Sequence, residues 1–261
     1  MTFTDAKQRF SNRAADYARY RPSYPSAVID VLRTECGLRP EHVIADVGSG
    51  TGILSKLFLE NGNRVFAVEP NDEMRHAGEE YLSGFENCSS VTGSAEATTL
   101  GNASVDFVTV AQAFHWFEAS TARREFLRIL RPAGFAAIIW NERALDTTPF
   151  LRDYEELLNR FGTDYAKVSE SYPQREHIQQ FFATNPFTHK AFASFQDFDF
   201  DALAGRLHSS SYAPKEGHAN FAPMMAALRV VFEANQVAGR VRMEYTTQVY
   251  FGRLDALRNP G

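Results

Sequence analysis

The sequence predicts an α/β fold built on a doubly wound, largely parallel sheet. Residues 43–47 form a short apolar run, which is typical of a central parallel strand covered on both faces. Three glycines follow at alternate positions, Gly48, Gly50 and Gly52, where backbone can approach a ligand at the start of the next helix. Strand and helix patterns then alternate as far as about residue 140, as expected of parallel units.

The composition narrows the class of protein. A chain of 261 residues with 44% hydrophobic content can bury one substantial core, so we expect a single domain over residues 1–261. A net charge of -5 disfavours nucleic acid or an anionic membrane as a partner. Two cysteines are too few for a disulfide framework or a zinc site, and we predict no bound metal. No apolar run approaches the roughly 20 residues that span a bilayer, so we expect a cytoplasmic protein.

The first forty residues are predicted to form a helical cap over the glycine loop. Residues 5–21 have the apolar spacing of an amphipathic helix, which must end at Pro22 and Pro25. Ser26 is then placed to cap a helix over residues 27–36.

Residues 41–140 are predicted to form the cofactor-binding core. A turn at residues 132–134 leads into its last strand. Asp72 is the expected N-cap of its second helix. After the strand at 43–47, the expected helices are 53–61, 72–83 and 118–130, and the expected strands are 64–68, 89–92, 105–111 and 135–140.

From residue 141 onward the regular alternation stops. Helices over about 150–164 and 174–183 predict a helical lid insertion at residues 141–184. Residues 185–261 are expected to complete the sheet at a mixed edge. The last two strands are connected only through a pair of helices, and no other long crossover of the kind that joins parallel strands lies between them. The strands expected there are 190–200 and 241–253. The expected helices are 201–209 and 221–239, and Asp201 is the expected N-cap of the first.

Acidic side chains follow the second and third strands. Glu69 comes 21 positions after Gly48. In nucleotide-binding βαβ units, a carboxylate at about this distance from the glycine loop accepts hydrogen bonds from the ribose diol. Glu96 could accept a bond from an adenine amine, or could lie in a solvated loop. The glycine spacing differs from the dinucleotide fingerprint and lacks the Gly-Lys-Ser/Thr ending of a triphosphate loop, which disfavours NAD and ATP.

An aromatic run follows the strand at 105–111, at the sheet edge where ligands bind in open α/β folds. Within it, His115 is a candidate general base, needed only if the acceptor is a hydroxyl or an amine; a packing role is the alternative. Three arginines in the predicted lid could hold an acidic substrate or could simply be solvated: Arg143, Arg152 and Arg175.

The ordered motifs resemble the class I S-adenosylmethionine-dependent methyltransferases. Asp46-Val47-Gly48-Ser49-Gly50-Thr51-Gly52 is similar to the family's first motif, Val68-Glu69-Pro70 to its ribose motif and Gly93-Ser94-Ala95-Glu96 to its adenine-side motif. The segments 10–25 and 111–117 resemble the small-molecule branch that includes trans-aconitate methyltransferase-like proteins. This likeness implies a Rossmann-like, seven-stranded mixed sheet of order 3-2-1-4-5-7-6 with its last strand antiparallel.

The resemblance also implies a site for S-adenosylmethionine, with S-adenosylhomocysteine as the product. The glycine loop would hold the methionine part, Glu69 the ribose, and Gln112 and Ala113 would lie near the sulfonium. The predicted cofactor-binding residues are Asp46, Gly48, Ser49, Gly50, Gly52, Glu69, Pro70, Asn71, Met74, Ala95, Glu96, Gln112, Ala113, Tyr17 and Arg21.

The expected reaction is in-line methyl transfer to a small molecule, with oxygen as the predicted acceptor atom. The predicted substrate contacts are Tyr24, Phe114, Trp116 and Trp140. The alternatives are cofactor binding without catalysis, and methylation of nucleic acid. The second of these is disfavoured because no Asn-Pro-Pro-aromatic or Pro-Cys motif follows the fourth strand.

Overall fold

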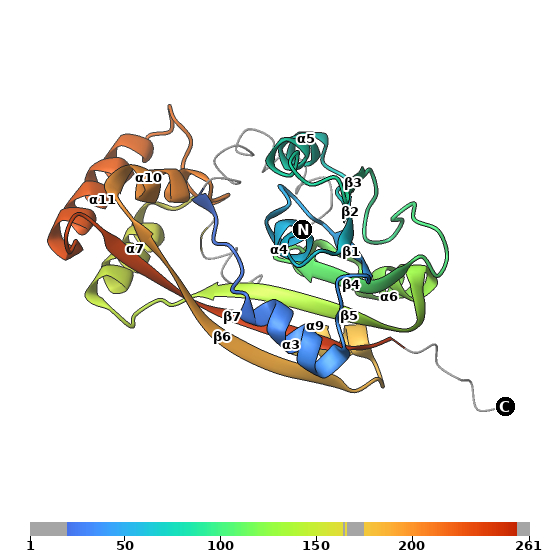
Figure 1. Ribbon diagram of the computed structural model, residues 1–261. Coiled ribbons are helices and arrows are strands. Elements are labelled where there is room, and N and C mark those ends of the chain that lie inside the picture. The colour runs from blue at the N-terminus through green and yellow to red at the C-terminus, as the bar shows by residue number, and fades with distance from the viewer. Residues whose placement is uncertain (1–19, 164, 166–174, 255–261) are drawn as a thin grey trace.

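The computed structural model describes residues 20–163, 165 and 175–254 (Figure 1). Most of the predicted helix over residues 5–21, including Tyr17, and the side chain of Arg175 lie outside this part. No helix among the described residues is long and apolar enough to cross a membrane.

A seven-stranded sheet forms the centre of the described structure, in the order β3-β2-β1-β4-β5-β7-β6. Strands β1 to β5 pair in parallel, whereas β7 is antiparallel to both β5 and β6. The predicted doubly wound mixed sheet, with its order and its reversed last strand, is therefore confirmed. The strands are β1 (Val43–Val47), β2 (Arg64–Val68), β3 (Cys88–Val91), β4 (Val105–Ala111), β5 (Leu130–Arg143), β6 (Phe187–Phe198) and β7 (Val241–Arg253).

Helices cover both faces of the sheet because successive strand residues point to opposite sides. In β4, Phe107 packs in one core with α3 and α4, while Val108 and Val110 pack in a second core with α6 and α9. The helices in chain order are α3 (Ala27–Cys36), α4 (Ile53–Glu60), α5 (Asp72–Tyr81), α6 (Ala119–Ile129), α7 (Pro149–Phe161), α9 (Arg175–Phe182), α10 (Phe200–His208) and α11 (Phe221–Asn235).

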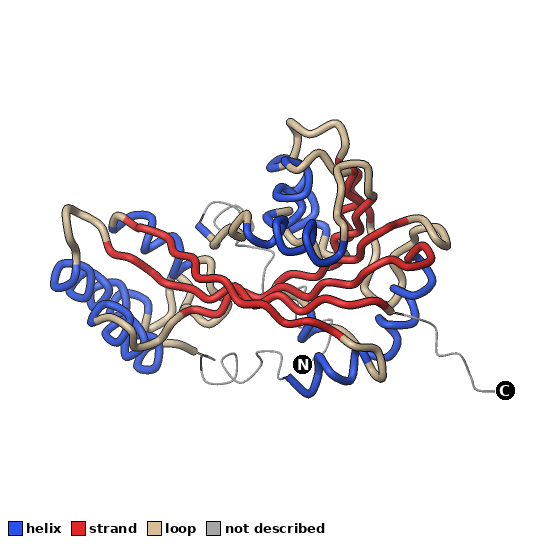
Figure 2. Tube along the Cα trace, turned by 60° about the horizontal axis from the view of Figure 1, so that its bottom comes forward, coloured by secondary structure: helices blue, strands red, loops and turns tan. Residues whose placement is uncertain are grey.

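The two helices of the predicted lid lie in different places. Helix α7 packs with α10, α11 and one end of β7 in a third hydrophobic core, at the end of the molecule to which β6 and β7 extend (Figures 1 and 2). Helix α9 instead packs against α6 beneath the sheet, through Phe181 and Phe182. The division into a cap at 1–40, a core at 41–140, a lid at 141–184 and a C-terminal part at 185–261 stays a prediction.

Two predicted helix caps are wrong, and a third lies at the predicted position without a capping hydrogen bond. Asn71, not Asp72, caps α5, because its side chain accepts a hydrogen bond from the Met74 amide at 3.0 Å. Asp199, not Asp201, caps α10 in the same way, through the Ala202 amide at 2.9 Å. Ser26 is the N-cap residue of α3, as predicted, but it has helical dihedral angles, φ -55° and ψ -24°, and its side chain makes no capping bond.

The predicted turn at residues 132–134 lies inside a longer strand. Strand β5 runs continuously from Leu130, and its register with β4 shifts between Val105 and Phe107. Ala133 takes a positive φ of 65° there. The chain therefore makes an irregularity in the strand instead of leaving the sheet.

Candidate active site

The glycine loop after β1 is held close to the end of β4. Gly48, Gly50 and Gly52 have φ values of +70°, +57° and +81°, which other residues rarely adopt. A Cβ on Gly48 would lie 2.7 Å from the Cβ of Ala113, which leaves no room for a side chain. Helix α5 approaches from another side, where a Cβ on Gly78 would lie 3.2 Å from the Gly50 carbonyl oxygen. The loop thus presents bare backbone at the carboxyl edge of the sheet.

Glu69 ties this loop to the end of β2. Its Oε2 accepts a hydrogen bond from the Gly50 amide and its Oε1 from the Asn71 amide, both at 2.9 Å. The residue is 8% exposed. Because a carboxylate offers about four lone-pair sites, it can accept further bonds from a ligand after these two.

Asp46, at the end of β1, faces the protein interior. Its carboxylate accepts hydrogen bonds from Ser55 Oγ at 2.6 Å and Thr109 Oγ1 at 3.3 Å, which join the start of α4 to β4. Burial raises the pKa of the Asp46 carboxyl to about 6. The side chain therefore positions the elements around the glycine loop.

We expect Asp46→Asn to remove a pH dependence of stability. A raised pKa in the folded state stabilises the fold below the unfolded value of 3.8, and this contribution disappears as the pH rises through about 6. The free energy of unfolding of the wild type should fall by about 3 kcal/mol relative to the variant over that interval. Urea denaturation between pH 4 and pH 7 measures this difference. Parallel pH profiles for the two proteins would contradict it.

The predicted adenine-side residues lie beyond Glu69. Met74 is buried, and its Cε is the atom that a Cβ on Gly50 would meet at 3.3 Å. The Asn71 side chain is used in capping α5. Ala95 is buried, while Glu96 accepts a hydrogen bond from the Glu118 amide at 3.0 Å and so helps to connect the loop after β3 to α6.

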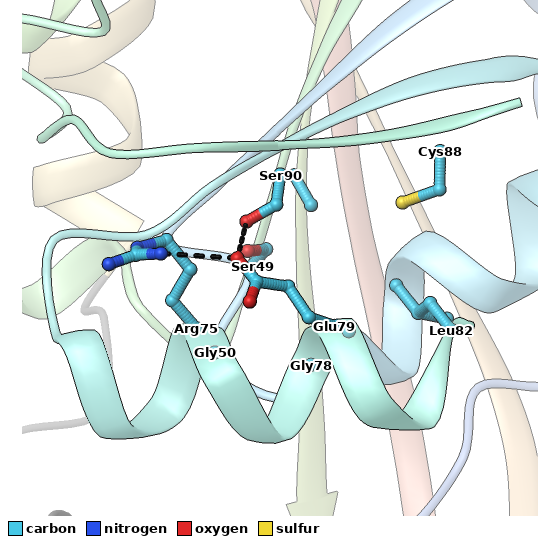
Figure 3. A pocket seen from close by; sticks show the side chains of 10 residues that line it. Ser49, Gly50, Arg75, Gly78, Glu79, Leu82, Cys88 and Ser90 are labelled. Carbon is cyan, nitrogen blue, oxygen red and sulfur yellow. Dashed lines mark hydrogen bonds and ion pairs between the residues drawn. The ribbon is translucent and has the colours of Figure 1, made fainter.

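A pocket lies on the α5 side of the glycine loop (Figure 3). Ser49 and Gly50 form its loop side, and Cys88 and Ser90 of β3 lie opposite. Glu79 accepts hydrogen bonds from Ser90 Oγ at 2.7 Å and from the Arg75 guanidinium at 3.1 Å across it. Three of the polar side chains that line this pocket, Arg75, Glu79 and Ser90, are thus engaged with one another.

The chain turns sharply after β4. Gln112 has a φ of 55° and its side chain donates to the Asn141 carbonyl at 3.0 Å, which links the ends of β4 and β5. His115 follows on a short 3-10 turn, with its ring centre 4.5 Å from that of Trp116 and 5.2 Å from that of Trp140. Burial lowers the pKa of its imidazole to about 4, and its Nδ1 has no hydrogen-bond partner among the described residues. A neutral imidazole of this kind is a weak base.

Of the other aromatic and N-terminal residues that were predicted to bind ligands, some lie in the core and some at the edge of the site. Phe114 is 3% exposed and packs edge-on against Phe181 of α9, so its side chain belongs to the core. Tyr24 is partly buried against the core beside α3. The Arg21 guanidinium donates to the Ser209 carbonyl at the end of α10, at 2.9 Å.

The structure contains a buried cluster of arginines and tyrosines. The sequence singled out only Arg143 and Arg21 among its members. Arg206 on α10 is 5% exposed, and the side chain of Arg143 at the end of β5 is 6% exposed. Both guanidinium groups interact electrostatically with Tyr154 and Tyr212. A signal was present, since Arg206 follows Leu203 and precedes Leu207 on the apolar face of its helix. The tyrosines of the cluster are Tyr154, Tyr165, Tyr212 and Tyr245.

Part of this sequence is similar to known proteins. The profile of a family described as a methyltransferase domain matches residues 45–138. An uncharacterized methyltransferase-like protein of Schizosaccharomyces pombe is 33% identical over 156 residues, which are 59% of this chain and 59% of that protein. An uncharacterized methyltransferase of Mycobacterium tuberculosis is 35% identical over 158 residues, which are 60% of this chain and 62% of that protein. The chain thus spans about three fifths of the length of these relatives.

Solved structures agree with respect to the fold. A putative type II methyltransferase from Anaeromyxobacter dehalogenans has a TM-score of 0.64 and 24% identity, and the match covers 90% of this chain and 98% of that one. A putative methyltransferase from an antibiotic biosynthesis pathway of Anabaena variabilis has a TM-score of 0.63 and 20% identity, with 89% and 98% coverage. Residues 45–138 thus match the profile of a methyltransferase domain, and the solved structures show that the fold around them is shared.

Proposed function

We propose that the protein is an S-adenosylmethionine-dependent methyltransferase that methylates an oxygen of a small molecule, as in the trans-aconitate methyltransferase-like branch. The observation that supports this best is the position of Glu69, whose carboxylate joins the Gly50 and Asn71 amides beside a loop that has no room for a side chain at Gly48 or Gly52. Such a carboxylate is suited to a ribose diol, and the bare backbone to the close approach of a polar chain.

In this proposal the chain itself holds and shields the reactants. Gly48, Ser49, Gly50 and Gly52 hold the methionine part of the cofactor, and Glu69 and Pro70 hold the ribose end. Gln112 and Ala113, at the end of β4, border the reacting centre, where alignment and exclusion of water account for much of the rate. When bound, S-adenosylmethionine supplies a methyl group on a positively charged sulfur. His115, with its lowered pKa, is better suited to packing against Trp116 and Trp140 than to removing a proton.

Calorimetry tests the proposal directly. S-adenosylmethionine and S-adenosylhomocysteine should both bind, whereas NAD should not. Failure of both sulfur compounds to bind would overturn the proposal. Binding without methyl transfer to a panel of small acids, phenols and amines would favour a protein that binds the cofactor without catalysis.

We expect Glu69→Gln to weaken cofactor binding while the protein remains folded. The amide retains one acceptor for the loop but loses the charge that strengthens hydrogen bonds to a diol, a loss of about 1.5–3 kcal/mol, or roughly 10- to 150-fold in Kd. Calorimetry with S-adenosylhomocysteine measures the change, and thermal unfolding checks the fold. Glu73→Gln is a matched control, because Glu73 is an exposed residue in the first turn of α5. Equal Kd values for Glu69→Gln and this control would rule out the role given to Glu69.

A further inference from the structure

A buried asparagine joins four segments of the chain beside the proposed site. Asn141, near the end of β5, is 5% exposed. Its side-chain nitrogen donates to the Ser23 carbonyl at 3.2 Å, and its main-chain carbonyl accepts a hydrogen bond from the Gln112 side chain at 3.0 Å. Its side-chain oxygen accepts a hydrogen bond from Thr247 Oγ1 of β7 at 2.7 Å. One residue thus connects the ends of β4 and β5 to β7 and to the chain before α3.

The hydrogen bonds around Asn141 allow a single arrangement of donors and acceptors. The Ser23 carbonyl can only accept, so the Asn141 side chain must turn its nitrogen to Ser23 and its oxygen to Thr247. A hydroxyl has one proton, and Thr247 donates it to Asn141. The Ser194 hydroxyl of β6, 3.3 Å away, is therefore the donor to Thr247 Oγ1. Because Thr247 is fully buried, a partner removed from this network leaves an unsatisfied polar group in the interior.

On one side the network holds the chain that leads into α3. Residues 21–25, which we call the strap, run from α10 to α3 (Figure 1). The strap has no regular secondary structure, and two of its five residues are prolines, which have no amide hydrogen to donate. At its start the Arg21 guanidinium donates to the Ser209 carbonyl at 2.9 Å, and in its middle the Ser23 carbonyl accepts the hydrogen bond from Asn141. The position of the strap therefore depends on side-chain hydrogen bonds to the elements beside it.

On the other side the network reaches the glycine loop. Gln112 directly follows β4 and has a φ of 55°, which is uncommon for a residue with a side chain. The hydrogen bond from its side chain to the Asn141 carbonyl braces this turn against the end of β5. Ala113 comes next, and a Cβ on Gly48 would lie 2.7 Å from the Ala113 Cβ. The strap, Asn141, the end of β4 and the glycine loop thus form a continuous series of contacts.

We infer that Asn141 is a positioning residue of the methyltransferase site, which fixes the strap on one side and, through Gln112, the glycine loop on the other. This inference rests on the proposed function, because that function places the cofactor against the glycine loop. Asn141 acts through the main chain of Ser23 and the side chain of Gln112. Without the hydrogen bond from Thr247, the Asn141 side chain is no longer held in the orientation that pairs with the strap. The site is then assembled in only a fraction of the molecules, and the apparent affinity for the cofactor falls by that fraction.

A single hydroxyl group tests the inference. Thr247→Val removes the donor to Asn141 and keeps a branched side chain, whereas Thr247→Ser keeps the donor. We expect Thr247→Val to weaken the binding of S-adenosylhomocysteine by roughly tenfold in calorimetry, and Thr247→Ser to bind within about twofold of the wild type. Thr246→Val is the matched control and should bind like the wild type. Thr246 is the preceding residue of β7, points to the opposite face of the sheet and makes no side-chain hydrogen bond among the described residues.

Stability measurements separate a positioning role from a structural one. In urea, Thr247→Ser and Thr247→Val should both unfold earlier than the wild type, but only Thr247→Val should lose affinity. Wild-type affinity in Thr247→Val, or an equal loss in both variants, would overturn the inference. If Thr247→Val does not fold, the double variant Asn141→Leu/Thr247→Val replaces both partners with apolar groups and leaves no unsatisfied polar atom between them. The double variant should fold and bind S-adenosylhomocysteine at least roughly tenfold more weakly, and wild-type affinity in it would contradict the role of Asn141.

Hydrogen exchange supplies a measurement that needs no cofactor. The Gln112 amide donates to the Ile139 carbonyl at 3.2 Å, so its exchange reports on opening at the end of β4. We expect this amide to exchange at least about fivefold faster in Thr247→Val than in Thr246→Val, because the brace from Asn141 is weakened. Equal exchange rates in the two variants would show that the network does not fix Gln112 and would overturn the inference. If S-adenosylhomocysteine does not bind the wild type while the exchange rates differ as expected, the proposed function fails and the positioning of Gln112 by Asn141 stands.

Discussion

Gly48→Ala should strongly slow methyl transfer and destabilise the fold. An alanine at a φ of +70° costs roughly 1–2 kcal/mol by itself, and its Cβ would lie 2.7 Å from the Cβ of Ala113 and 3.2 Å from Phe117 Cζ. Either the glycine loop or the end of β4 must then move. Because these two segments border the proposed reacting centre, a displacement of about 1 Å is expected to lower kcat/KM by roughly 10²-fold.

Gly37→Ala is the control for this substitution. Gly37 has nearly the same φ, +67°, but nothing lies within 4 Å of the Cβ that it would gain. It should therefore lose roughly 1–2 kcal/mol of stability while its affinity for S-adenosylhomocysteine stays that of the wild type. Urea denaturation and calorimetry on the two variants separate backbone strain from steric overlap. Equal cofactor affinities in both variants would show that the close approach of Gly48 to Ala113 does not matter for binding.

Phe181→Ala should have the largest effect on stability. Phe181 is fully buried on α9, with its ring centre 5.3 Å from that of Phe114 and 5.7 Å from that of Phe126 on α6. Removing a buried phenylalanine costs about 3–5 kcal/mol through lost burial and the cavity left behind. We expect the free energy of unfolding in urea to fall by this amount.

The same variant decides whether α9 is part of the core or a detachable lid. Phe195→Ala is a suitable control, because Phe195 on β6 is 56% exposed and its ring packs under the Arg242 guanidinium at 3.8 Å. That control should lose no more than about 1 kcal/mol. If both variants unfold at the same urea concentration, α9 opens without unfolding the core and the packing described for it carries little energy.

The parts of the site that are local in sequence were predictable. The apolar run of β1, the three glycines and Glu69 at the end of β2 lie within 27 residues, from Val43 to Glu69. Periodicity identifies the strands, and the residue types define the chemistry available at the loop between them. The order of the sheet followed from the family resemblance, which these local motifs carry.

Helix partners and helix caps were less predictable. Amphipathic patterns show that α7 and α9 each bury a face, but they do not show that α7 packs with α10 and α11 while α9 packs with α6. Asn71 and Asp72 are both good capping residues, and the geometry of a single amide, that of Met74, decides between them. These choices depend on contacts between segments that are far apart in the chain.

The amino-acid sequence by itself determined the α/β class, the strand and helix order, and the glycine loop with its acidic partner, because apolar periodicity and glycine placement act over a few residues. Only the tertiary structure showed that, in the aromatic run after β4, Phe114 is a core residue while His115 contacts Trp116 and Trp140. Only the tertiary structure also brought Arg143 and Arg206, more than 60 positions apart, to the same buried tyrosines, Tyr154 and Tyr212. Burial turns these residues into a strong electrostatic feature, and burial is a property of the assembled fold.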